Sequence, residues 1–155
     1  GLMNKPRFAV YEEFVKRFRQ AAKTVGKKIY LVNYWISAHP GASLSRTLKL
    51  GLYLAKRRIR PEQIQDFLPS PMTLATCMYH TGQDPFTGKK VYIPRSERER
   101  RRQRALLQYD RPQNRKLLVE ALEKLNSLHV LPKFEQAVKA GRAKARRRTR
   151  PKSRS

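Results

Sequence analysis

Acidic residues, cysteine and long apolar runs are all scarce in this chain. Only 11 Asp and Glu stand against 36 Lys and Arg, which leaves a formal net charge of +25 over 155 residues. The longest apolar run covers residues 29–36 and is interrupted by Asn33, so it is too short for a transmembrane helix, which needs about 20 apolar residues. The single cysteine, Cys77, excludes an internal disulfide framework and cannot by itself hold a zinc or iron–sulfur site.

The remaining composition is that of a folded protein. Hydrophobic residues make up 39% of the chain, which is enough to bury a core, and the length suits one domain of ordinary size. No secretory signal is visible, because Lys5 and Arg7 are not followed by a continuous apolar segment. We therefore expect a cytoplasmic protein without a membrane partner.

Positive charge is concentrated at the carboxyl end. From Lys139 onward there are nine basic residues and no acid, and almost no apolar side chain beyond alanine. This composition predicts a disordered basic tail over residues 139–155. Such a run is either a solubilising arm or a contact to nucleic acid, and the sequence favours neither. Under the second interpretation, the candidate phosphate contacts are Arg98, Arg101, Arg102, Arg146, Arg147 and Arg148.

The first half of the chain alternates between helical and strand patterns. Apolar residues at helical spacing predict a helix with one buried face over residues 8–25. Residues 29–36 are β-branched, aromatic and almost continuously apolar, which is typical of a strand covered on both faces. A second helix capped by Ser43 or Ser45 and a short strand over residues 64–68 follow.

This alternation is the pattern of a parallel α/β sheet or barrel. In such folds the loops at the carboxyl ends of the strands hold ligands. The segments 37–41 and 67–71 therefore lie where a site is expected.

The second half is predicted to be irregular and then helical. Prolines and glycines indicate a turn-rich stretch over residues 69–94, with a hairpin near residues 86–88. Ser96 and Glu99 match a capping box that opens a very basic helix to about Tyr109. Further helices are expected over residues 110–125 and 132–140.

Single residues with reactive side chains are few. Cys77 and His80, three residues apart, could form a thiolate–imidazole pair, although a small buried cysteine is the more frequent case. His39 precedes Pro40 and Gly41 at a predicted strand end. A structural hydrogen bond in this turn and a catalytic role are equally compatible with its position. The dispersed histidines and lone cysteine predict no metal site.

Several motifs in order resemble the YgiQ-like branch of the radical S-adenosylmethionine (SAM) proteins. They are Leu-Met-Asn-Lys-Pro at 2–6, Ile-Ser-Ala-His-Pro-Gly at 36–41, Gln-Ile-Gln-Asp-Phe-Leu-Pro-Ser-Pro-Met-Thr at 63–73, Ala-Thr-Cys-Met-Tyr-His-Thr-Gly at 75–82, Asp-Pro-Phe-Thr-Gly at 84–88, Val-Tyr-Ile-Pro at 91–94 and Gln-Arg-Ala-Leu-Leu-Gln-Tyr at 103–109. The resemblance covers most of residues 2–125. The chain departs from it at Ala38-His39, where many related enzymes carry a glycine followed by an aromatic residue.

This resemblance implies a fold and cofactors. Residues 1–75 would be the last βα units of a partial TIM-type barrel, residues 76–138 a mostly helical family extension, and residues 139–155 the basic tail. Radical SAM enzymes bind a [4Fe–4S] cluster through a Cys-x3-Cys-x2-Cys loop, and the cluster cleaves SAM to a radical. This chain lacks the triplet. It would hold no cofactor alone, and its partner would be the missing N-terminal barrel half of a parent enzyme.

Two classes of function stay open. The first is a C-terminal fragment of a radical SAM iron–sulfur enzyme of unknown substrate, inactive by itself. By resemblance, the residues near SAM would be Ile36, Ser37, Ala38, His39, Gln65 and Phe67, and no catalytic residue is assigned. The second is a basic nucleic-acid-binding module.

Overall fold

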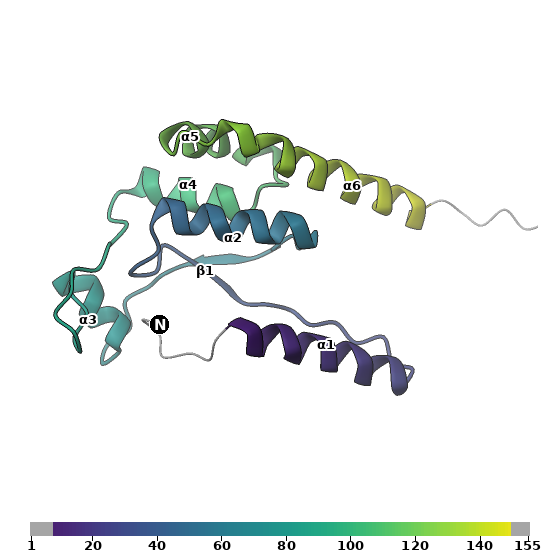
Figure 1. Ribbon diagram of the computed structural model, residues 1–155, viewed down its shortest axis with the longest axis horizontal. Helices are drawn as coiled ribbons and strands as arrows, with labels where there is room; N and C mark the ends of the chain where they lie inside the picture. Colours follow the sequence, from purple (N-terminus) through teal and green to yellow (C-terminus); the bar gives the residue numbers. More distant parts are fainter. Residues whose placement is uncertain (1–7, 150–155) are drawn as a thin grey trace, which may run out of the picture.

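Helices dominate the chain and are interrupted by two short strands (Figure 1). The computed structural model describes residues 8–149, and the side chains of residues 8–141. The elements in chain order are α1 (Phe8–Thr24), β1 (Trp35–Ser37), α2 (Leu44–Arg57), β2 (Ile64–Asp66), α3 (Leu74–Thr81), α4 (Glu97–Leu107), the 3-10 helix η1 (Pro112–Asn114), α5 (Arg115–Lys124), the 3-10 helix η2 (Leu128–Val130) and α6 (Leu131–Thr149). The α/β prediction is confirmed at this level.

The two strands are parallel neighbours joined through α2. Trp35 pairs with Ile64 and Ser37 with Asp66 in the ladder. A parallel pair needs a crossover connection, and α2 supplies it, as the predicted alternation of strands and helices requires. Within residues 8–149 these strands form a two-stranded sheet and no barrel closes, so the barrel stays a prediction.

The hydrophobic core lies between α2, α4, α5 and α6. Leu54, Leu106 and Phe134 are fully buried members of it, from α2, α4 and α6. Gly51 lets α2 approach α4 closely, because a Cβ atom at this position would lie 2.5 Å from the carbonyl oxygen of Leu106. The core therefore joins residues from both sides of the expected domain boundary at residue 75.

Helix α1 forms where the sequence predicts it, but its apolar face is not buried. None of its residues is buried, and Phe14 is 52% exposed. Part of this face, including Val15 and Phe18, is half-buried, and the ring of Phe8 lies edge-on at 5.1 Å from that of Tyr53 on α2. Polar contacts add to this: Arg57 donates to Glu12 at 2.7 Å, and Tyr11 donates to Asn33 at 2.8 Å. In Figure 1, α1 lies apart from the helical layers formed by α2, α4, α5 and α6. Helical periodicity was thus sufficient to predict the helix and insufficient to predict its burial.

The predicted strand over residues 29–36 is largely absent. Only its end contributes to β1, and the preceding residues are extended and exposed, with Val32 at 89% and Tyr34 at 72%. A strand exists only where a neighbour accepts its backbone hydrogen bonds, and β2 reaches no further than Trp35. The prediction of a strand covered on both faces is therefore wrong for this structure.

Helix α3 lies within the stretch that was predicted to be irregular. Thr73 caps it by accepting a hydrogen bond from the amide of Thr76 at 3.2 Å, and Gly82 ends it with a φ of 68°. The hairpin expected near residues 86–88 is confirmed by an antiparallel bridge between Gln83 and Lys90. The prediction of an irregular stretch was based on its many prolines. These prolines lie on either side of α3 and none lies within it, so they do not prevent the helix.

The last helix is longer than predicted. A helix was expected over residues 132–140 and a disordered tail after it, but α6 continues to Thr149. The residues after Gly141 are mostly arginine, lysine and alanine, which have high helix propensity, so a helix can continue without a core beneath it. The rest of the predicted tail, residues 150–155, lies outside the described residues, as does the motif at residues 2–6.

Candidate functional site

The carboxyl ends of β1 and β2 bring the predicted SAM-contacting residues together. Ile36 lies opposite Gln65 in the ladder, and the amide of Phe67 donates to the carbonyl oxygen of Ser37 at 2.8 Å. Ala38 and His39 follow directly after β1. The six predicted residues come from two segments almost thirty residues apart, and parallel pairing places them at one edge of the sheet.

An acid that the sequence analysis did not single out, Asp66, ends β2 at the centre of this edge. Ser37 Oγ donates to one carboxylate oxygen of Asp66, and Arg104 of α4 donates to the other at 2.5 Å. Partial burial raises the pKa of Asp66, but the hydrogen bonds from Arg104 and Ser37 and the charges of Arg104 and Arg100 outweigh it and hold that pKa below its usual value. The sequence offered one sign of this role, because Asp66 is an acid in a predicted strand of a chain with few acids.

The loop after β1 is fixed by a buried glutamine. Gln103 of α4 accepts a hydrogen bond from the amide of Ala38 at 3.1 Å and donates to the carbonyl oxygen of Ala42 at 2.6 Å. Gln103 is fully buried. The amide of Gly41 also donates to the carbonyl oxygen of Tyr92 at 2.7 Å. Two residues from later in the chain, Gln103 and Tyr92, thus fix the backbone of the loop after β1.

Ala38 adopts a backbone conformation that favours glycine. Its φ is 58°, in the left-handed region. This is the position at which the resembling enzymes often carry glycine, so the loop geometry agrees with that pattern although the residue differs. Strain at Ala38 is compatible with the structure because Gln103 holds the backbone on both sides of the turn.

A row of aromatic side chains leads away from the strand ends. The ring of His39 lies 5.0 Å from that of Phe67, which in turn lies 5.7 Å from that of Tyr79 on α3. The guanidinium of Arg95 lies 5.8 Å from the centre of the Tyr79 ring. His39 Nδ1 donates to the carbonyl oxygen of Pro40 at 2.9 Å, which makes Nε2 the acceptor in the neutral form of the ring. The sequence did not single out Tyr79, because α3 was not expected, or Arg95, which lies in the loop before α4.

Cys77 and His80 give no support to a metal or thiolate site. Both are exposed on α3, so the expectation of a buried cysteine is wrong. In the part of the chain that the structure describes, no three side chains of His, Cys, Asp or Glu lie close enough together to hold a metal ion. The same residues contain no helix that is both long and apolar enough to cross a membrane.

The arginines predicted on α4 are engaged in ion pairs. Arg98 and Arg102 both reach Glu120 of α5, at 3.1 and 3.2 Å, and Arg101 pairs with Glu97 one turn earlier. The hydrogen bond from Arg98 lowers the pKa of Glu120, so this carboxylate stays charged. These arginines join α4 to α5 and stabilise α4. The side chains of Arg146, Arg147 and Arg148 lie outside the described residues.

Comparison with known proteins places the chain in a family. A family model described as a domain of unknown function, DUF3362, matches residues 62–155, a stretch that includes β2, Phe67 and Tyr79 of the aromatic row, and α4. The chain belongs to the DUF3362 family. No solved structure matches the chain. The match begins between α2 and β2, so β1 and its loop lie before the stretch that the DUF3362 model covers.

The curated relatives are longer proteins. A UPF0313 protein of Methanosarcina mazei is 47% identical over 129 residues, which are 83% of this chain and 21% of the relative. A UPF0313 protein of Geobacter sulfurreducens is 46% identical over 78% of the chain and 20% of its own length, and one of Clostridium botulinum is 46% identical over 80% and 19%. This DUF3362 chain thus spans about a fifth of the length of these relatives and corresponds to a C-terminal part of a UPF0313 protein.

Proposed function

We propose that the chain is the C-terminal part of a YgiQ-like radical SAM iron–sulfur enzyme, and that it supplies one wall of the SAM site. One observation carries the proposal: the parallel ends of β1 and β2 gather the residues that the resemblance assigns to SAM. In parallel α/β folds, this edge of the sheet is where ligands bind. The two strands would be the last of a barrel whose other strands belong to the rest of the parent enzyme.

Within this site, the residues divide into two kinds. Ser37 Oγ and the amide of Ala38 are already bonded to Asp66 and Gln103, so they position the strand end. The side chain of Gln65 is exposed, and His39 keeps a free acceptor at Nε2. We therefore assign polar contacts to SAM to Gln65 and His39. Apolar contacts are assigned to two half-buried side chains, Ile36 and Phe67.

The residues present do not fit an iron–sulfur cluster. A [4Fe–4S] cluster in this class needs three cysteine thiolates, and the chain has one cysteine, which is exposed. In the proposal, the cluster and the radical chemistry that it supplies belong to the part of the parent enzyme that carries the cysteine triplet. The present chain performs no catalytic step by itself, and the substrate is not assigned.

The missing N-terminal barrel half would cover the exposed apolar surface. Side chains of the segment before β1 are largely open to solvent, including Val32 at 89% and Tyr34 at 72% exposure. Monomeric soluble proteins seldom expose a contiguous apolar patch of large area. The relatives extend far beyond this chain, so they contain enough residues to cover it. We place the parent enzyme in the cytoplasm, consistent with the scarcity of cysteine.

The gene and the isolated chain provide the first test. We expect the reading frame upstream of Gly1 to encode a Cys-x3-Cys-x2-Cys triplet, and a full frame without it would overturn the proposal. We expect the chain alone, after anaerobic reconstitution, to show no iron–sulfur absorbance and to form no 5′-deoxyadenosine, because one thiolate cannot hold the cluster.

The SAM wall is tested in the longer protein with two matched variants. Gln65→Ala removes a polar side chain in the middle of β2, and Gln63→Ala removes the same side chain before the strand. We expect the first to weaken SAM binding about fivefold, the effect of one hydrogen bond, and the second to leave it unchanged. Equal affinities of the two variants would exclude the assigned wall.

A further inference from the structure

Two basic segments that are distant in the sequence meet where α2 ends. Arg60, just after α2, donates to the carbonyl oxygens of Ala137 and Val138 on α6, at 2.9 Å each. Its guanidinium also lies against Gly141, where a Cβ atom would collide with it. The basic end of α2 is therefore fixed against α6 at the point where the basic run of α6 begins.

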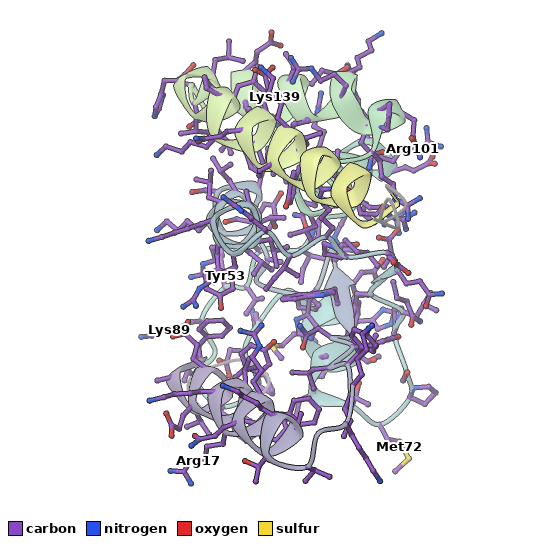
Figure 2. All side chains as sticks on the ribbon, turned by 90° about the vertical axis from the view of Figure 1, so that its right-hand side faces the viewer. Arg17, Tyr53, Met72, Lys89, Arg101 and Lys139 are labelled. Carbon is purple, nitrogen blue, oxygen red and sulfur yellow. The ribbon has the colours of Figure 1, made fainter. Side chains whose placement is uncertain are left out.

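The cations at this junction are available to a ligand. Lys56, Arg58 and Lys139 are exposed, and among the side chains of residues 8–141 none of the three has a carboxylate within ion-pair distance. The contrast with α4 is direct, since Arg98, Arg101 and Arg102 are paired with Glu120 and Glu97. In Figure 2, Arg101 lies at one side of the molecule and Tyr53 of α2 lies at the other.

Helix α6 carries the positive charge beyond the body of the protein. Figure 1 shows it running past the end of α2. Residues 139–149 of this helix contain no acid, and their rise of about 1.5 Å per residue gives a basic segment about 15 Å long. We define the α2–α6 basic surface by the side chains that the structure places at this junction, Lys56, Arg58, Arg60 and Lys139, together with the helical segment that continues to Thr149. The sequence of that segment adds Arg142, Lys144, Arg146, Arg147 and Arg148.

We propose that the α2–α6 basic surface binds the phosphate backbone of nucleic acid. Arginines that are close in the sequence suit phosphates, because guanidinium groups form paired hydrogen bonds with them. A membrane surface is disfavoured, because residues 141–149 contain no apolar side chain larger than alanine and an interfacial helix needs Leu, Phe or Trp. The surface contacts phosphates and reads no base sequence. This binding is independent of the proposed radical SAM activity.

Titration with a short labelled RNA of mixed sequence, at two salt concentrations, tests the surface. The double variant Lys56→Gln with Arg58→Gln removes two cations from it. We expect the affinity for RNA to fall about five- to tenfold at the lower salt concentration. The slope of log affinity against log salt concentration should decrease by the amount expected for about two phosphate contacts. The triple variant Arg146→Gln, Arg147→Gln and Arg148→Gln should weaken binding further.

Two controls separate this surface from net charge. Lys89→Gln with Lys90→Gln removes two exposed lysines from the hairpin after α3, at the opposite end of the molecule from the end of α6 (Figure 1). Arg98→Gln with Arg101→Gln neutralises the paired arginines of α4. We expect both to bind RNA within twofold of the unmodified chain, with unchanged circular dichroism in every variant. Losses equal to that of the α2 variant would overturn the proposal, and so would equal affinity for anionic lipid vesicles.

Discussion

At the scale of single residues, the few acids of this chain are used as partners for arginine. Asp66 joins β2 to α4 through Arg104, Glu120 joins α5 to α4, and Glu135 joins α6 to Arg115 at the start of α5. The chain has 36 basic residues and 11 acids, so most cations cannot have a carboxylate of their own. The position of each carboxylate therefore decides which arginines are structural and which are available to a ligand.

Replacement of Asp66 should destabilise the fold in a pH-dependent way. The variant Asp66→Asn loses the charged hydrogen bond to Arg104, and we expect it to cost about 1–2 kcal/mol at neutral pH, after allowance for partial exposure. The folded-state pKa of Asp66 is lowered, so its contribution is present above its ordinary pKa of about 4 and is lost as the pH falls through the folded value.

Urea unfolding at neutral pH and below pH of about 3 measures this difference. The stabilities of the unmodified chain and the variant should converge in acid. Glu13→Gln is the control, because Glu13 pairs with Arg17 on the exposed surface of α1, and its replacement should have no measurable effect. A difference for Asp66→Asn that persisted unchanged in acid would contradict the electrostatic explanation.

At the scale of the elements, local caps decide where the helices begin. Ser43 caps α2 by accepting from the amide of Arg46 at 3.3 Å, and Ser96 caps α4 by accepting from the amide of Glu99 at 3.2 Å. The sequence allowed Ser43 or Ser45 for α2, and the structure selects the first. Thr73 has the same function for α3, so a cap also marks the helix that proline frequency concealed.

The two serines near the start of α2 provide a matched pair. Ser43→Ala removes the cap and should lower the free energy of unfolding by about 0.5–1 kcal/mol. Ser45→Ala lies within the first turn and is exposed, so it should change stability by less than about 0.5 kcal/mol. Thermal or urea unfolding of the two variants distinguishes them, and an equal loss would mean that Ser43 is not the cap.

At the scale of the whole molecule, the core and the amino-terminal segments are unequally buried. The helices α2, α4, α5 and α6 share one core, whereas α1 contributes no buried residue and the segment before β1 is exposed. Within the described residues, each of the two parallel strands has one neighbour and one edge without a partner strand. Under the proposed function, the rest of the longer protein would cover these exposed segments.

The isolated chain should therefore self-associate. Exposed apolar side chains on α1 and in residues 29–34 should pair between copies, and the weight-average mass should rise with protein concentration in sedimentation experiments. Val32→Ser with Tyr34→Ser should reduce this association, while Phe86→Ser, which removes a side chain 79% exposed on the hairpin, should not. A monodisperse monomer at all concentrations would contradict this expectation.

The sequence by itself determined the local features. It predicted α1, α2 and α4 nearly to their ends, together with the cap at Ser96, because amphipathic period and cap chemistry involve residues within a few positions of one another. It also determined the order of β1, α2 and β2. From that order it followed that the ends of the two strands meet, since a crossover helix makes the strands parallel.

Only the tertiary structure decided which distant residues meet. Ser37, Asp66 and Arg104 form one network although they lie in three separate elements, and no local pattern encodes such a contact. The tertiary structure also decides which charged side chains are paired. Glu120 pairs with arginines of α4, and Arg60 holds the basic end of α2 against α6. Burial was decided there too, because an apolar face is covered only where another element lies against it.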